Sequence, residues 1–78
     1  MKKEMVEYQE KLGQAIRQQR EKVGLSQPEA AEKLGMSRAS YAYYELGKIC
    51  PDALTLRKMA EVLETDVSAL AYPERYTA

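Results

Sequence analysis

Residues 25–48 read LSQPEAAEKLGMSRASYAYYELGK and predict two short helices joined by a tight turn. Ser26 stands directly before the first helix and Ser37 before the second, where a serine hydroxyl can accept a hydrogen bond from a free backbone N–H. Pro28 costs little in a first helical turn, because those N–H groups have no partner within the helix. Gly35 tolerates the left-handed backbone that ends a helix abruptly. Such a unit can place its second helix in the major groove of DNA.

The size and composition of the chain predict one small globular domain. It has 78 residues, of which 45% are hydrophobic and 31% charged, the usual balance of a soluble protein. No apolar run approaches the roughly 18 residues that a membrane span needs, and the N-terminus lacks the apolar segment of a secretory signal. Cys50 is the only cysteine, so no internal disulfide can form. We therefore expect a cytoplasmic protein that does not associate with membranes.

The charges are balanced overall but unevenly distributed. Twelve basic and twelve acidic residues give a net charge of zero. Residues 11–48 contain seven basic and four acidic residues, a local charge of +3, whereas residues 1–10 carry −1 and residues 49–78 carry −2. A modest positive patch on the candidate motif can attract phosphate groups, and it predicts binding that weakens strongly with added salt.

Apolar spacing and helix-start residues predict five helices and no strand. Leu12 and Ile16 lie four residues apart, on one face of a first helix over about residues 4–23. The second and third helices are expected at about 27–34 and 38–46. Asp52 is expected to cap a fourth helix that ends at about Leu63. Asp66 is expected to cap a short fifth helix with Val67 and Leu70, which Pro73 ends. The expected fold class is all-α, a compact five-helix domain. Its boundaries are predicted at residues 1–11 for an N-terminal extension of the first helix, 12–71 for the domain and 72–78 for a C-terminal tail.

The two short helices are expected to have an inward and an outward side. Ala31 lies where they approach most closely, so a small side chain is needed there. The outward side is predicted to carry Arg38, Ala39, Ala42 and Tyr43. An exposed face that begins with a helix N-terminus and an arginine suits a groove lined with phosphates and base edges. The inward side is predicted to carry Ala30, Leu34, Met36, Tyr41 and Tyr44.

Taken together, these segments resemble the Cro/repressor family of helix-turn-helix regulators, also named XRE-type. The resemblance extends from about Leu12 to Leu70 and rests on small, glycine and apolar positions that fall in register across two helices. It implies a repressor-like DNA-binding domain whose partner is double-stranded DNA. The matching segments are LGQAIRQQR at 12–20, GLSQ at 24–27, AAEKLGMSR at 30–38, YELGK at 44–48, and residues 51–63.

The resemblance also implies a role for individual residues. Arg38, Ala39 and Tyr43 match the base-reading positions, where arginine can bind guanine and alanine can approach a thymine methyl group. Arg20 and Glu45 match a partly buried ion pair that joins the first helix to the third. The expected phosphate contacts are Gln27, which also supports the third helix, Ser37, Ser40 and Lys48.

The leading hypothesis is a sequence-specific transcriptional regulator, a repressor or a small autoregulatory controller. It is expected to bind a pseudo-palindromic operator as a homodimer, with half-sites about 34–36 Å apart. The apolar residues expected at the dimer surface are Leu54, Val62, Leu70 and Tyr72.

A second hypothesis from another class is a protein-interaction module, such as an antitoxin-like partner that keeps the fold but binds DNA weakly. The zero net charge and the tyrosine-rich segment at 41–44 motivate it. An enzyme is disfavoured, because the chain has no histidine, no glycine-rich phosphate loop and a single cysteine. We predict no cofactor, no metal and no small-molecule ligand.

Overall fold

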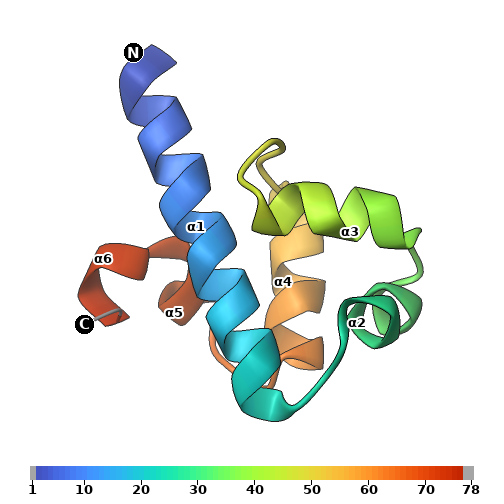
Figure 1. Cartoon of the computed structure of the whole chain (residues 1–78). Helices are drawn as coiled ribbons and strands as arrows, with labels where there is room; N and C mark the ends of the chain where they lie inside the picture. Colours follow the sequence, from blue (N-terminus) through green and yellow to red (C-terminus); the bar gives the residue numbers. More distant parts are fainter. Residues whose placement is uncertain (1, 77–78) are drawn as a thin grey trace.

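All regular elements in residues 2–76, the part of the chain that the computed structural model describes, are helices (Figure 1). The all-α class is therefore confirmed, and all five expected helices are present. The helices are α1 (Lys2–Val23), α2 (Gln27–Leu34), α3 (Arg38–Glu45), α4 (Ala53–Val62), α5 (Val67–Ala71) and the additional one-turn α6 (Pro73–Tyr76). None of them is long and apolar enough to cross a membrane.

The C-terminal end differs from the predicted tail. Pro73 does not leave an irregular segment but begins α6, since a proline in the first helical turn loses no helical hydrogen bond. The Pro73 ring is also fully buried, which fixes this end against the body. Residues 77–78 of the predicted tail, and Met1 of the predicted extension, lie outside the described residues.

Local hydrogen bonds explain where the helices begin. The Ser26 hydroxyl accepts from the Glu29 N–H at 3.2 Å, and the Glu29 carboxylate accepts from the Ser26 N–H at 2.8 Å, which is a capping box. Asp52 Oδ1 caps α4 by accepting from the Thr55 N–H at 2.8 Å. Asp66 is the N-cap residue of α5, as expected, but its side chain makes no cap hydrogen bond. Its backbone is extended there, and α5 is held instead by packing into the core.

The helices enclose one core, with α1 running through the length of the molecule (Figure 1). Helices α2 and α3 lie on one side of α1, and α5 and α6 lie on the other. Helix α1 contacts α3, α5 and α6, while α4 contacts α2 and α5. The largest fully buried apolar side chains are Leu12, Ile16, Tyr41, Met59, Leu63 and Leu70.

Two of the four residues predicted for a dimer surface are not free to form one. Leu70 is only 1% exposed and belongs to the core, so it is corrected from a surface candidate to a core residue. Val62 is half-buried and packs against the same core. On a short helix, helical spacing alone does not distinguish apolar residues that face the core from those that face a second copy. Only the tertiary structure shows which of them are covered. Leu54 and Tyr72 are exposed.

Two glycines let α1 approach the end of α3. A Cβ atom on Gly13 would lie 2.5 Å from the carbonyl oxygen of Glu45 and 2.7 Å from that of Tyr44. Gly47 has φ +75°, and a Cβ there would lie 2.8 Å from Glu10 Cα. Backbone therefore packs on backbone at this crossing, which sets the position of α3 relative to α1.

Candidate nucleic-acid interface

The turn between α2 and α3 is closed by backbone and serine hydrogen bonds. Gly35 has φ +70° and ends α2, with its N–H donating to the carbonyl of Glu32 at 3.0 Å. The Ser37 hydroxyl accepts from the Ser40 N–H at 3.1 Å and donates to the Ser40 hydroxyl at 3.0 Å. Met36 packs against the core between them. The start of α3 is therefore fixed, and the hydroxyls of Ser37 and Ser40 both lie exposed beside it.

The outer side of α3 is open to solvent, and its inner side is covered. Arg38, Ala39 and Tyr43 are all exposed, whereas Tyr41 is fully buried. Ala42 differs from the prediction, because it is half-buried rather than fully outward. The three predicted base-reading residues are thus brought to one accessible helix face.

Lys48 follows α3 in a defined position. The Lys48 N–H donates to the Tyr43 carbonyl at 2.9 Å, and the Gly47 N–H donates to the Tyr44 carbonyl at 3.2 Å. This pair of bonds around a left-handed glycine is a Schellman motif, which ends α3 and turns the chain sharply. The Lys48 side chain is exposed just beyond the end of the helix.

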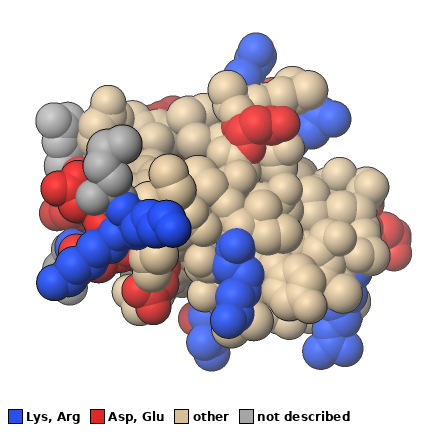
Figure 2. Space-filling model, turned by 90° about the horizontal axis from the view of Figure 1, so that it is seen from above, with Lys and Arg blue, Asp and Glu red and all other residues tan. Residues whose placement is uncertain are grey.

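Basic side chains are dispersed around this face rather than gathered into one patch. Figure 2 looks down on the molecule from above, onto the side that carries α3. Lys and Arg side chains are scattered around a largely uncharged centre, with Asp and Glu side chains among them (Figure 2). Among the basic residues of the motif, Arg17 is partly engaged, since its Nε lies 3.5 Å from the Glu21 carboxylate in an exposed ion pair.

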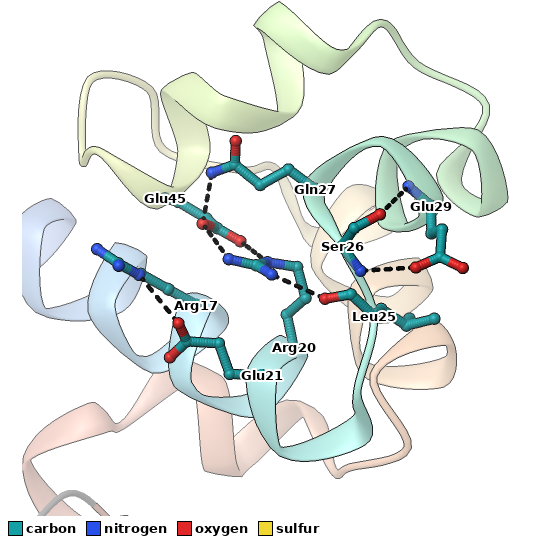
Figure 3. A network of polar contacts seen from close by, with 8 residues as sticks. All are labelled: Arg17, Arg20, Glu21, Leu25, Ser26, Gln27, Glu29 and Glu45. Carbon is teal, nitrogen blue, oxygen red and sulfur yellow. Dashed lines mark hydrogen bonds and ion pairs between the residues drawn. The ribbon is translucent and has the colours of Figure 1, made fainter.

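A buried ion pair ties α3 to the end of α1 (Figure 3). Arg20 Nε donates to Glu45 Oε2 at 2.6 Å, and Arg20 Nη2 donates to Glu45 Oε1 at 3.2 Å. Arg20 Nη1 donates to the Leu25 carbonyl at 2.7 Å, so the guanidinium also holds the segment before α2. The two residues are 8% and 7% exposed, respectively. The structure thus brings together the pair that the resemblance implies.

Gln27 completes this network from the first turn of α2. Its Nε2 donates to Glu45 Oε1 at 2.9 Å, so one carboxylate joins α1, α2 and α3 (Figure 3). Burial by itself raises the pKa of Glu45, but hydrogen bonds led by that from Arg20 outweigh it and hold the pKa below its ordinary value. The hydrogen bond to Glu45 correspondingly raises the pKa of Arg20, against the effect of burial. Both groups are therefore charged at neutral pH.

Leu46 is an exposed residue of this face for which no role is predicted from the sequence. It is the C-terminal cap residue of α3 and keeps helical backbone angles, φ −77° and ψ −7°. Its side chain is exposed together with that of Tyr43. The available signal is its spacing, since residues three and seven positions apart share one helix face and Leu46 stands seven after Ala39.

No metal centre is formed by the described residues. Nowhere in residues 2–76 do three or more His, Cys, Asp or Glu side chains gather in a way that could hold a metal ion. The chemistry of the α3 face is that of hydrogen-bond donors, hydroxyls and apolar groups.

Two short helices at a glycine turn, with the second helix exposed and braced from behind, define the class of helix-turn-helix DNA-binding domains. A family model described as helix-turn-helix matches residues 16–70. The chain belongs to this family, the XRE-type group that includes Cro and repressor proteins. It is thus a DNA-binding helix-turn-helix regulator. No curated protein is similar enough in sequence to give a match.

Proposed function

We propose that this chain is a sequence-specific transcriptional regulator, a repressor or a small autoregulatory controller, that reads DNA with the outer face of α3. The observation that carries the proposal is the exposed face of α3, held rigidly from behind by the pair of Arg20 and Glu45. A face fixed in this way is preorganised for a groove, so little ordering is needed on binding. The protein acts by binding rather than by catalysis, in the cytoplasm with its DNA.

Arg38 is proposed as the principal polar base reader. It stands at the first position of α3 with an exposed side chain, from which a guanidinium can bind guanine O6 and N7 together. Ala39 and Tyr43 follow on the same face, within reach of neighbouring bases. Each bidentate contact of this kind contributes about 1–3 kcal/mol of discrimination between bases.

The phosphate contacts are proposed to flank the base readers. Ser37 and Ser40 lie at the N-terminus of α3, and Lys48 lies beyond its C-terminal end. One N–H of the Gln27 amide donates to Glu45, which leaves the second N–H available for a phosphate oxygen. Contacts from both ends of α3 would fix its register in the groove.

A homodimer on a pseudo-palindrome is the proposed binding form. Two copies related by a two-fold axis would place their α3 helices about 34–36 Å apart, one turn of the duplex. Leu54 and Tyr72 are the exposed apolar residues that support a contact between copies, because both lie outside the core. Selection of bound sequences from a random duplex library tests this form. A two-fold symmetric motif is expected, and a single unrepeated half-site would contradict the dimer.

A protein-interaction module is the second candidate function. The net charge of zero and the tyrosine-rich segment at 41–44 favour it. A salt series distinguishes the two, since binding through phosphates weakens steeply as salt is raised and an apolar protein contact does not. Binding to duplex DNA that does not change with salt would count against the DNA-binding proposal.

Arg38→Ala is expected to weaken binding to the selected operator by about 1–3 kcal/mol and to relax the preference at one base pair. The reason is the loss of a bidentate contact to a base, with the fold untouched because Arg38 is exposed. Titration of labelled duplexes that vary at each position measures it. Arg57→Ala, an exposed arginine of α4, is the matched control. Equal loss on every duplex would make Arg38 a phosphate contact instead.

Lys48→Ala is expected to weaken binding to all duplexes by the same factor. A lysine that neutralises one phosphate releases about one counterion, so the slope of log affinity against log salt should become shallower by about 0.9. Titrations at four or more salt concentrations measure the slope, with Lys58→Ala on α4 as control. An unchanged slope would exclude a phosphate contact from Lys48.

A further inference from the structure

The outer face of α3 carries a continuous apolar stripe. Ala39, Tyr43 and Leu46 follow one another at intervals of four and three residues, which places them on one line along the helix. Tyr43 is 49% exposed and Leu46 is 63% exposed. The opposite side of the same helix carries Tyr41 in the core. The stripe is therefore the middle of the outward face and not its edge.

No charged residue lies on this stripe, and the basic groups stand at its two ends. Arg38 begins α3, and Lys48 follows its C-terminal cap. Figure 2 shows a largely uncharged centre on this side, with both basic and acidic side chains around it. The major groove of DNA has the complementary form, with phosphates along its walls and base edges on its floor. This complementarity favours DNA over an apolar protein surface as the occupant.

The base edges that an apolar side chain can contact are few. Guanine, cytosine and adenine present hydrogen-bonding groups in the major groove, whereas thymine presents a methyl group beside its O4. An alanine, a tyrosine ring or a leucine placed over a polar edge would remove water from it without replacing the lost hydrogen bonds. The cost of that desolvation discriminates against those bases, and contact with the methyl group favours thymine.

We infer that Ala39, Tyr43 and Leu46 read thymine methyl groups, and that each half-site carries thymines beneath the stripe. The inference rests on the proposed function and specifies the bases that the site recognises. From residue 39 to residue 46 the helix rises about 10 Å. Because base pairs are about 3.4 Å apart, the stripe spans about three base-pair steps. Two or more thymines are therefore expected within about four consecutive base pairs of each half-site.

Replacement of thymine by uracil tests the inference, since it removes the methyl group and leaves base pairing unchanged. Duplexes of the selected operator carry deoxyuridine at one thymine position in each half-site, and dissociation constants are measured at fixed salt. At two or more positions the wild-type protein is expected to bind about fourfold more weakly for each methyl group removed. Leu46→Ala should abolish the sensitivity at one position, and Tyr43→Ala at another. Met5→Ala, at an equally exposed apolar residue of α1, should keep the full uracil sensitivity.

Three results would overturn the inference. They also distinguish its failure from a failure of the proposed function. If every uracil duplex binds as tightly as the thymine duplex while the operator is still preferred, the protein reads DNA without the stripe. If the selected half-site holds no thymines within four neighbouring pairs, the same conclusion follows. If no operator is selected and Leu46→Ala disrupts self-association instead, the stripe is a protein contact and the proposed function fails with it.

Discussion

Glu45→Ala is expected to destabilise the fold by about 3–5 kcal/mol, because it leaves a buried guanidinium without its counter-charge. Arg20, which is 8% exposed, would lose both of its hydrogen bonds to the carboxylate. Gln27 would lose its partner as well. A small domain has about 5–15 kcal/mol of total stability, so the variant should be marginally folded at best. Urea denaturation followed by helical circular dichroism measures the change.

Two control variants make this result specific to the buried pair. Arg17→Ala removes the exposed pair with Glu21, and it should change stability by less than about 1 kcal/mol. The double variant Arg20→Met, Glu45→Leu removes both charges together and should recover much of the lost stability, since neither charge is left unpaired. A loss below about 1 kcal/mol for Glu45→Ala would show that the pair does not hold α3 in place.

Gly13→Ala is the second substitution with a large expected effect. It is expected to lower the stability of the fold, whereas glycine-to-alanine substitutions inside a helix usually raise it. Alanine in the middle of a helix is normally more stable than glycine by about 0.5–1 kcal/mol. Here the new Cβ would lie 2.5 Å from the backbone oxygen of Glu45, so α1 and α3 must move apart. Overpacking of this kind costs about 1–3 kcal/mol, and it shifts the helix that reads DNA.

Thermal unfolding and operator affinity should both decrease for Gly13→Ala. Gln14→Ala, at the next and exposed position of α1, is the matched control and should leave both nearly unchanged. A Gly13→Ala variant that is more stable than the wild type would mean that α1 and α3 do not touch at this crossing.

The helices were predictable from the sequence because their signals are local. Ser26, Ser37 and Asp52 each cap a helix with a hydrogen bond to the residue three positions on. A glycine with positive φ follows α2, as its position in the sequence indicates. Such signals need no knowledge of the rest of the chain, so the bounds of α2 agree with the prediction.

What the sequence did not predict depends on contacts between distant residues. The position of Leu70 in the sequence fits a surface residue as well as a core residue. Only the packing of the helices shows that it is buried. Gly13 looks unremarkable in a helical segment until the end of α3 is placed against it. Pro73 follows the end of α5, as expected, but the short helix α6 that it begins was not predicted, and the burial of its ring depends on the packing of the whole fold.

In the candidate site, too, some features could be predicted from local sequence and others could not. Helical spacing alone predicts that Arg38, Ala39 and Tyr43 share the outward side. The pairing of Arg20 with Glu45 could be assigned only through resemblance, since the two residues lie 25 positions apart. No role was predicted for Leu46 because leucine is usually a core residue, although its spacing from Ala39 and Tyr43 places it on the outward side.

The most direct test of sequence-specific binding through α3 is a ratio of two dissociation constants. One is measured for the selected operator and the other for a scrambled duplex of the same length and composition, both at about 0.15 M salt. Specific recognition predicts that the operator binds at least about 10³-fold more tightly. Equal affinity for the two duplexes would contradict it, because phosphate contacts alone would then account for all of the binding.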